Sequence, residues 1–581
     1  MKHIHPNNAK TTKMKNSTYP SSAIAFSAKA ETNQPINQST ISGNLVDLFQ
    51  RRIYPAEITV ADGVIVSVKE TATAAEQYIL PGFIDAHIHI ESSMLVPTAF
   101  AQIAVVHGTV ATVSDPHEIA NVNGREGVQY MIDNSKLSPF KFFFGAPSCV
   151  PATNFETAGY TLDALAVEDL LQSPDIWYLS EMMNYPGVLH HDPGVMAKIA
   201  AAKRIGKPVD GHAPGLRGDT ASAYAAAGIT TDHECFTLDE ALDKIKAGMH
   251  ILIREGSAAK NYEALAELLR LHPDKVMFCS DDKHPDDLIL HHINGLVKRS
   301  LQKGYDLFDV LRAACLHPVT HYKLPVGLLR KNDAADFIVV NNLVDFDVLK
   351  TYIDGELVAE NGKTLLPAVT VKPINNFNAA KKKEEEFRIK AKSANPVIRV
   401  IEAIEGQLIT KMLELPAKVV DGFTVSNPER DVLKIAVVNR YEKDAPVAIA
   451  FIKNFGLAHG AIASTVAHDC HNIIAVGVDD VSICAAVNTL IDSKGGLAAA
   501  RHKDDVIYMP LPVAGLMSLK NGYEAASEYT GLNARAKELG TPLHAPFMTL
   551  SFMALLVIPS LKLSDKGLFD GEKFAFTSVE V

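Results

Sequence analysis

The sequence predicts an α/β protein built on a (β/α)8 barrel of the TIM type, with a small flanking β-sandwich domain and an additional C-terminal α/β or α+β domain. Three observations predict this fold. Eight apolar runs of strand length recur in the middle of the chain, each interval between them has room for one helix, and strand-like patterns flank this middle segment on both sides. The 581 residues are enough for about two to four domains.

Residues 1–40 differ in composition from the rest of the chain. They are rich in Ser, Thr, Asn, Lys and Pro and have no sustained apolar period, so we predict a disordered tail. The tail contains the tripeptide His3-Ile4-His5. No rigid strand directs these two imidazoles, and we therefore do not predict a metal site there.

Short alternating segments predict the strands of the small β domain at residues 41–80 and 325–370. The first group includes "AEITVADGVIVSVKE", in which an Asp-Gly turn separates two strands, and the second includes "KTYIDGELVAENGK". Because the two groups lie on either side of residues 81–324, we expect one β domain made from both, with the barrel inserted between them.

The barrel strands are predicted from eight apolar runs that each stop at polar or ionisable residues. The runs lie at residues 83–89, 109–115, 141–148, 176–181, 207–212, 228–233, 250–255 and 275–281. Active sites of such barrels lie at the carboxyl ends of the strands. Here those ends carry His87, His89, Asp115, Glu181, His212, His233, Glu255 and Asp281.

The spacing of His87 and His89 indicates a metal site. Side chains alternate along a strand, so both imidazoles are expected to face the barrel interior. Asp85 shares that face one layer deeper, where we expect it to hold a ring N–H of a metal ligand. An isolated His-x-His is weak evidence, so the prediction depends on the ligand-type residues at four other strand ends, Glu181, His212, His233 and Asp281.

This order of ligands resembles the amidohydrolase superfamily, over residues 41–365. In many two-metal members of that superfamily, strand four supplies a carboxylated lysine that bridges the metals, and here Glu181 holds that place. Each oxygen of a carboxylate can bind one cation, so a glutamate can also bridge. The resemblance implies a metal-dependent hydrolase with two divalent ions per subunit, manganese or iron(II) with zinc as the alternative, held by His87, His89, Glu181, His212, His233 and Asp281.

A narrower resemblance is carried by the motifs "PGFIDAHIHIESSM", "SDPHEIANVNG", "GHAPG", "DHE" and "CSDDKHP". They look like the adenine deaminase family of the bacterial type. That family also has a long C-terminal domain, which residues 371–581 with "HDCHNIIAVGVDD" resemble. The resemblance implies hydrolysis of adenine to hypoxanthine and ammonia, a step of purine salvage.

Candidate roles follow for residues near these ligands. Metal-activated hydroxide would attack C6 of adenine, and Asp281 would carry a proton from water to the departing amine. Glu91 is a candidate donor to ring N1, or alternatively a solvated loop carboxylate. Asp282 is a candidate partner of a ring nitrogen, or alternatively a helix cap. The remaining candidate substrate contacts, which alternatively order loops, are Ser92, Asp115, His117 and Glu118. His117 and Glu118 are also candidates for the outer shell of the metal site.

Three further patterns are predicted to supply neither direct metal ligands nor catalytic groups. His117-Glu118 begins like the HExxH zinc motif, but position 121 is Asn instead of a second His. His468 and His471 are predicted to be hydrogen-bonded structural or substrate-lid residues rather than metal ligands. The run "KKKEEEFRIKAK" at residues 381–392 predicts a solvated helix.

The composition argues against several other functions. The formal net charge is −11 and there is no Lys/Arg-rich face, so the basic surface of a nucleic-acid-binding protein is missing. The six cysteines are not clustered, which indicates a reducing compartment and predicts the cytoplasm. The most apolar stretch, "TLSFMALLVIPSL", is shorter than the roughly 20 residues that a membrane span needs. The expected partners are a small substrate and water, in a homo-oligomer.

The ligand pattern alone leaves two alternatives open. Another amidohydrolase, acting on a cyclic amide or on a different nucleobase, would use the same metal ligands. A barrel that serves as a non-catalytic scaffold is the second alternative, and it is disfavoured because every type of ligand is present at a strand end.

Overall fold

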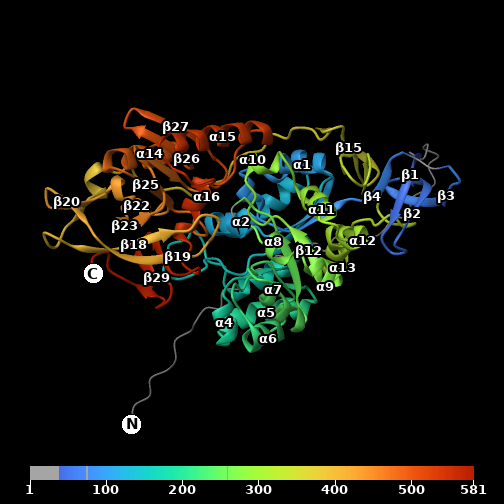
Figure 1. Ribbon diagram of the computed structural model, residues 1–581, viewed down its shortest axis with the longest axis horizontal. Helices are drawn as coiled ribbons and strands as arrows, with labels where there is room; N and C mark the ends of the chain where they lie inside the picture. The colour runs from blue at the N-terminus through green and yellow to red at the C-terminus, as the bar shows by residue number, and fades with distance from the viewer. Residues whose placement is uncertain (1–37, 74–75, 258) are drawn as a thin grey trace, which may run out of the picture. The chain divides into compact units, whose positions relative to one another are not determined.

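The computed structural model describes residues 38–73, 76–257 and 259–581 (Figure 1). The predicted tail up to residue 37, including His3 and His5, lies outside the described residues. Its predicted end at residue 40 is wrong, because β1 (Gln38–Asp47) already pairs with β2 (Arg52–Ala61) at its first residue, Gln38 opposite Ala61.

The barrel prediction is confirmed, since all eight predicted strands are present and parallel. Five form one sheet and three form another, and backbone hydrogen bonds close the ring at both junctions. One runs from Thr230 N to Val209 O (2.9 Å) and one from Asp281 N to His87 O (2.9 Å). The strands are β5 (Phe83–Ile88), β6 (Thr109–Ser114), β7 (Lys141–Ala146), β8 (Ile176–Met182), β9 (Val209–Gly211), β10 (Thr231–Asp232), β11 (His250–Arg254) and β12 (Val276–Cys279).

Helices connect the barrel strands, as βα units require. They carry the chain from the carboxyl end of one strand to the start of the next, so the polar residues after each strand meet at one mouth. The helices are η1 (Ile90–Ser93), α1 (Pro97–Ala104), η2 (Val105–His107), α2 (His117–Ser135), α3 (Ala164–Leu171), α4 (Tyr185–Leu189), α5 (Pro193–Ile205), α6 (Gly218–Ala226), α7 (Leu238–Lys246), α8 (Tyr262–Leu265), α9 (Leu268–Leu271), η3 (Pro273–Lys275), α10 (Pro285–Leu288), α11 (Ile293–Gln302), α12 (Leu307–Leu311), η4 (Arg312–Leu316) and α13 (His317–Tyr322).

The strands on either side of the barrel in the sequence form one eight-stranded sheet instead of the two sheets of a sandwich, in the order β16-β15-β14-β13-β4-β1-β2-β3. The reason is β4, which pairs parallel with β1 and antiparallel with β13 and thus joins the two groups. The buried core of this sheet contains Leu45, Ile58 and Phe337. The remaining strands are β3 (Val64–Glu70), β4 (Tyr78–Pro81), β13 (Phe337–Val340), β14 (Val348–Ile353), β15 (Glu356–Glu360) and β16 (Lys363–Thr364).

The C-terminal region contains a second eight-stranded sheet, in the order β19-β18-β23-β22-β25-β24-β26-β27. Only the β18–β23 pair in it is parallel, and α14 packs against it, so of the two predicted classes this part is α+β (Figure 1). The elements are β18 (Val397–Ala403), β19 (Thr410–Pro416), β20 (Lys418–Val420), β21 (Phe423–Val425), η6 (Pro428–Arg430), β22 (Val432–Val438), β23 (Val447–Lys453), β24 (Ala461–Ser464), β25 (Ile473–Gly477), α14 (Asp480–Ser493), β26 (Gly496–His502), β27 (Asp505–Pro510), α15 (Gly522–Glu538), α16 (Pro546–Ser551), η7 (Phe552–Ala554), β28 (Leu561–Ser564), β29 (Gly567–Asp570) and β30 (Ala575–Phe576).

Residues 381–392 do not form the predicted solvated helix. They contain one 3-10 turn, η5 (Glu384–Phe387), and the short strand β17 (Ile389–Lys390), which pairs with β21. Phe387 is fully buried in the same apolar cluster as Val487 of α14. Burial of this side chain outweighs the helical tendency of the charged run, because helix propensity is only a weak preference.

The first part of the apolar stretch near the C-terminus lies in α16 and η7, and its last residue, Leu561, begins β28. Within the ranges that the structure describes, no helix combines the length and the apolar character needed to span a bilayer.

Asp336 joins the β domain to the barrel. Its buried carboxylate lies 2.7 Å from Nζ of Lys141, the first residue of β7. The same carboxylate accepts hydrogen bonds from the backbone N–H groups of Gly327 (2.9 Å) and Asp354 (3.0 Å). Removing this carboxylate would leave a largely buried ammonium group and two backbone donors without their partner.

We expect Asp336→Ala to lower the free energy of unfolding by about 3–5 kcal/mol, the usual result of removing one partner of a buried ion pair. Asp354→Ala is the matched control, because its carboxylate also contacts Lys141 (2.8 Å) but is 55% exposed. The free energy of unfolding of Asp354→Ala should be lower by about 1 kcal/mol or less. The fluorescence of Trp177 in β8, the single tryptophan, reports barrel unfolding in urea. Equal losses in the two variants would contradict the expectation.

Candidate metal centre and active site

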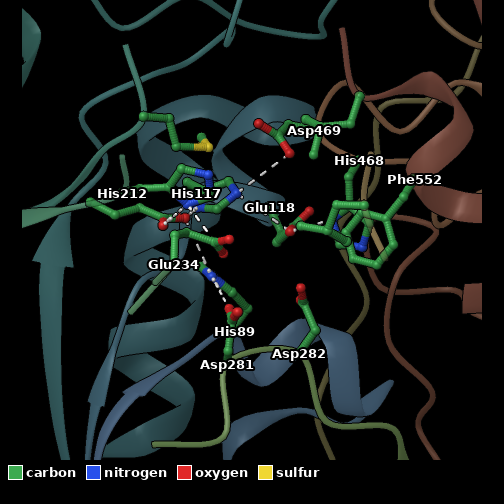
Figure 2. A pocket seen from close by; sticks show the side chains of 14 residues that line it. His89, His117, Glu118, His212, Glu234, Asp281, Asp282, His468, Asp469 and Phe552 are labelled. Atoms are coloured by element: carbon green, nitrogen blue, oxygen red, sulfur yellow. Dashed lines mark hydrogen bonds and ion pairs between the residues drawn. The ribbon is translucent and has the colours of Figure 1, made fainter. Parts of the chain in front are cut away.

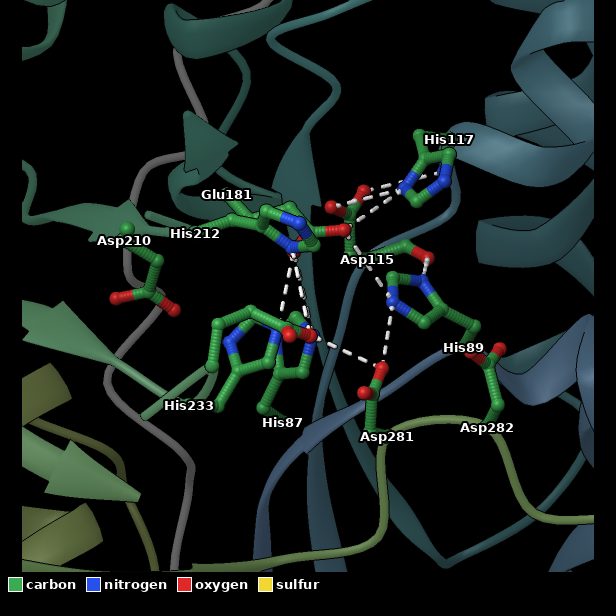
Figure 3. A network of polar contacts seen from close by, with 12 residues as sticks. His87, His89, Asp115, His117, Glu181, Asp210, His212, His233, Asp281 and Asp282 are labelled. Carbon is green, nitrogen blue, oxygen red and sulfur yellow. Dashed lines mark hydrogen bonds and ion pairs between the residues drawn. The ribbon is translucent and has the colours of Figure 1, made fainter. Parts of the chain in front are cut away.

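His87 and His89 come together at the carboxyl end of β5 (Figure 3). Both are buried, and their ring centroids are 4.9 Å apart. Nδ1 of His89 lies 3.1 Å from the carbonyl oxygen of Asp115. A carbonyl oxygen can only accept, so Nδ1 carries the proton and the lone pair of Nε2 is directed into the site. His89 is thus held in the tautomer that a metal ligand needs.

Asp281 follows β12 and reaches the same point because the barrel closes there. Its backbone N–H donates to His87 O (2.9 Å), and its carbonyl accepts from His89 N (3.3 Å). Oδ1 of Asp281 lies 3.1 Å from Nε2 of His89 and 3.6 Å from Nε2 of His87. Oδ2 faces away from the imidazoles and accepts from Arg254.

Glu181, near the end of β8, places its two carboxylate oxygens against different imidazoles (Figure 3). Oε1 lies 3.4 Å from Nε2 of His89 and 3.6 Å from Nδ1 of His117. Oε2 lies 2.8 Å from Nδ1 of His212 and 3.1 Å from Nε2 of His233. The carboxylate therefore separates two groups of nitrogen donors, which is the arrangement that a bridging ligand requires.

Several buried ring nitrogens in this cluster have no hydrogen-bond partner among the described residues. They are Nδ1 and Nε2 of His87, Nε2 of His212 and Nε2 of His233. Buried polar atoms normally have partners, and a cation would supply one. The donor sets His87–His89–Asp281, His87–Glu181–His233 and His212–His233–Glu234 each bring their ligand atoms within 4.8 Å of one another. Imidazole nitrogens and carboxylate oxygens of this kind fit zinc, manganese or iron(II).

The two carboxylates at the centre remain ionised in spite of their burial. Burial raises the pKa of Glu181, but His212 and His233 outweigh it and hold the pKa well below its usual range. Burial acts in the same direction on Asp281, and Arg254 with the neighbouring imidazoles holds that pKa well below its usual range. Two ionised carboxylates, surrounded by imidazoles that can be neutral, favour the binding of divalent cations.

Arg254 and Glu234 belong to the site but were not identified from the sequence. Arg254, the last residue of β11, is 1% exposed and its guanidinium contacts both Glu234 and Asp281. The prediction placed Glu255 at this mouth, and it is wrong. The side chain of Glu255 pairs with Arg299 (3.0 Å) outside the barrel, because alternation along β11 directs residue 254 inward. This alternation is the signal that could have identified Arg254.

Asp85 does not hold a metal-ligand imidazole, contrary to the prediction. Its carboxylate accepts from the backbone N–H of Ser280 (3.0 Å) and lies 2.7 Å from Nε2 of His292. It therefore connects β5 with the end of β12 and with His292. The barrel closure that brings Ser280 beside Asp85 decides this pairing.

A small cavity lies between the metal-ligand cluster and the C-terminal domain (Figure 2). Of the predicted substrate contacts, His117, Glu118 and Asp282 line it. The opposite wall comes from the C-terminal domain. The sequence analysis did not predict that most of its residues would line the cavity. They are Leu408, His468, Asp469, Phe552 and Leu555.

Three predicted substrate contacts, Ser92, Asp115 and Glu91, are not among the residues that line the cavity. Ser92 donates to Asp282 Oδ1 (2.5 Å), and Asp115 Oδ1 accepts from His117 N (3.1 Å), so both order residues that face the cavity. Glu91 is not among the residues that line the cavity, and its predicted contact with the purine ring stays a prediction. The η1 turn directs its carboxylate to the start of α2, where Oε1 accepts from Ile119 N (3.2 Å), and burial raises its pKa to about 7.

His468 and His471 both contact the carboxylate of Glu118. Nδ1 of His468 lies 2.6 Å from Oε1, and Nε2 of His471 contacts Oε2. The prediction that these residues form hydrogen bonds is confirmed by this geometry. Their partner is an unexpected one, because Glu118 belongs to the barrel and is 350 positions away from His468 in the sequence.

Comparisons with known proteins agree with this architecture. Residues 78–358 match the amidohydrolase family, and residues 407–575 match the adenine deaminase C-terminal domain. The adenine deaminase of Sulfurovum sp. (strain NBC37-1) is 57% identical over 537 residues, which are 92% of this chain and 98% of that protein. The adenine deaminase of Salinibacter ruber (strain DSM 13855 / M31) is 54% identical over 538 residues, again 92% and 98%.

Solved structures match part of the chain at low identity. The beta-aspartyl dipeptidase of Fervidobacterium islandicum AW-1 is 16% identical with a TM-score of 0.44, over 56% of this chain and 98% of that one. The dihydropyrimidinase of Brevibacillus agri NCHU1002 is 13% identical with a TM-score of 0.44, over 56% and 96%.

We expect Arg254→Met to destabilise the metal-free protein by about 3–5 kcal/mol, because Glu234 and Asp281 then lie buried without their cation. Adding Mn²⁺ should recover part of this loss, since a divalent ion replaces the missing positive charge. Arg299→Met is the control, because that arginine is 35% exposed and pairs at the rim. Arg299→Met should lower the free energy of unfolding by about 1 kcal/mol or less. The measurement is the thermal unfolding midpoint in chelator and with Mn²⁺, and equal midpoints for the two variants would contradict the role of Arg254.

Proposed function

The chain belongs to the adenine deaminase family of the amidohydrolases, and from this premise we propose that it hydrolyses adenine to hypoxanthine and ammonia at the mouth of its barrel. The reaction is a step of purine salvage. It replaces the amino group on C6 of the purine by an oxygen from water.

The observation that carries this proposal is the composition of the cavity wall. One side consists of the ligand-type residues of the barrel, which amidohydrolases in general share. The other side, including His468 and Phe552, comes from the segment that matches the adenine deaminase C-terminal domain. Part of the wall that would contact the substrate thus lies in the segment of the chain that is typical of adenine deaminases.

We further propose that two divalent ions occupy the cluster, manganese or iron(II), with zinc as the alternative. His87, His89 and Asp281 would hold one ion, His212 and His233 would hold the other, and Glu181 would bind both through its separate oxygens. When bound, the ions make water nucleophilic near neutral pH. The unpartnered ring nitrogens and the two faces of Glu181 support this assignment.

The surrounding side chains would move protons and orient the purine. Asp281 would accept a proton from the attacking water and deliver it to the amine as the bond between C6 and nitrogen breaks. Asp282, held by Ser92, would bind a ring nitrogen. His117 and Glu118 would form the side of the cavity next to the metal ligands, with Asp115 ordering His117.

The cellular setting is also a proposal. The six cysteines are all free and buried, which agrees with a reducing cytoplasm. A homo-oligomeric state stays a prediction from the resemblance.

Purified protein loaded with Mn²⁺ should release ammonia from adenine and produce hypoxanthine. Cytosine and guanine should release at least 100-fold less, on the order of what an unsatisfied buried hydrogen-bonding group costs in discrimination. Ring opening of dihydrouracil without ammonia release from adenine would instead favour a cyclic amidohydrolase. No turnover of any of these compounds would favour a non-catalytic barrel.

We expect Glu181→Gln to lose at least one equivalent of metal and to slow ammonia release by about 10³-fold or more, because the amide cannot bridge two cations. Glu255→Gln is the matched control, since this carboxylate also follows a barrel strand but turns to Arg299. Its metal content and rate should stay close to those of the unaltered protein. Metal analysis by mass spectrometry together with the ammonia assay checks both variants. Full metal content at a normal rate in Glu181→Gln would refute the bridging role.

A further inference from the structure

A buried hairpin of the C-terminal domain brings His468 to the cavity. Residues 465–472 connect β24 and β25 in the interior of the eight-stranded sheet. The backbone N–H of His468 donates to Ser551 O (3.1 Å), and the hydroxyl of Tyr441 donates to Cys470 O (2.6 Å). The hairpin is buried throughout, so it presents His468 from a fixed position.

The imidazole of His468 is held on two sides. Nδ1 lies 2.6 Å from Oε1 of Glu118, and a carboxylate can only accept, so Nδ1 carries a proton. The ring of Phe552 stacks on the imidazole with centroids 4.5 Å apart and an angle of 12° between the planes (Figure 2). Nε2 has no hydrogen-bond partner in the described part of the chain, although the side chain lines the cavity. This nitrogen is therefore free to contact a bound molecule.

His471 contacts the same carboxylate in a different way. Its Nδ1 accepts from the backbone N–H of Ala467 (3.2 Å), so its proton is on Nε2, which faces and contacts Oε2 of Glu118. A ring nitrogen that carries a proton has no lone pair for a metal. Although Glu118, His468 and His471 are close enough to hold a cation, the tautomer of His471 favours a hydrogen-bonded brace. His471 does not line the cavity.

The charges around His468 favour its protonated form. Burial lowers its pKa, but Glu118 and Asp282 outweigh burial and raise the pKa to about 9. Burial also raises the pKa of Glu118, and the facing imidazoles hold it well below its usual range, so Glu118 remains an anion. The charged and titratable groups that influence His468 are Glu118 on α2, Asp282 after β12, His284 before α10, and Asp469 and His471 on its own hairpin.

We propose that His468 is a catalytic residue, in which Nε2–H donates a proton to N1 of the purine from the wall opposite the metal centre. The inference rests on the proposed deamination of adenine. It assigns to the C-terminal domain the role of proton donor, for which Glu91 was the candidate from the sequence; His468 lines the cavity and Glu91 is not among the lining residues. Glu118 orients the donor, and His471 holds Glu118.

The proton count balances with water as the only co-reactant. As the water oxygen bonds to C6, the C6–N1 π electrons move to N1, which takes the proton from Nε2 of His468. Asp281 transfers the first water proton to the amine, and the bond from C6 to the amine breaks to release ammonia. The second water proton leaves as the C6 hydroxyl becomes the carbonyl, and it restores the imidazolium.

The test compares His468→Gln with His471→Gln in the metal-loaded full chain. We expect His468→Gln to keep its metal content and to lower kcat by about 10²–10³-fold, the usual contribution of a general acid. In the unaltered protein, kcat/KM should fall as the pH rises through about 9, because the acid form is lost. This basic limb should be absent in His468→Gln and present in His471→Gln. Added imidazole should partly restore the rate of His468→Gly but not that of His471→Gly.

Different results of this experiment would contradict the role of His468 and the proposed function. If His468 only docks the two domains, both Gln variants should lose stability and rate together and keep the basic limb, which overturns the proposal. A His468→Gln rate within about threefold of normal overturns it as well, since it is far below a general acid's contribution. If His468 variants do not fold, the unaltered protein decides, because a flat profile between pH 8 and 10 contradicts a required imidazolium. Absence of adenine turnover in the unaltered protein refutes the proposed function itself.

Discussion

The structure depends on the compensation of buried negative charge at the barrel mouth. Glu118, Glu181, Glu234 and Asp281 are all buried, and an ionised carboxylate without a partner costs several kcal/mol in such surroundings. The chain meets this constraint with the imidazoles that follow four barrel strands (β5, β6, β9 and β10), with Arg254 and with the two histidines of the C-terminal hairpin. The remaining unpartnered nitrogens leave room for the cations that the family implies.

This constraint explains why the site needs more than the barrel. Glu118 begins α2 at the mouth, yet the imidazoles that balance its charge come from residues 465–472. The same hairpin gives one wall of the cavity, and Phe552 fixes the ring plane of His468. A barrel without its C-terminal domain would keep the metal-type ligands, but it would expose Glu118 and leave the substrate cavity open on one side. The two domains therefore form one site.

Much of the metal cluster could be predicted from sequence because the relevant signals are local. An apolar run that stops at His or Asp marks a strand end, and alternation places His87 and His89 on one face. The same alternation, applied to β11, would have selected Arg254 over Glu255. Glu91 shows the limit of such reasoning, because the local pattern does not indicate that its carboxylate accepts a hydrogen bond from the start of α2. Asp85 was likewise assigned to the correct face but to the wrong partner, since Ser280 reaches it only across the closure of the barrel.

The sequence by itself determined the eight strands, their order and the residue types at their ends, because run length and side-chain alternation depend on neighbours only a few positions apart. The helix expected at residues 381–392 does not form, because a distant element decides the local structure. Phe387 is buried against α14, about a hundred residues later in the chain. Only the tertiary structure decided that Glu181 faces two groups of imidazoles, that Arg254 joins Glu234 to Asp281, and that His468 meets Glu118. These contacts join residues from 20 to 350 positions apart, and no local pattern encodes which distant charge will balance which.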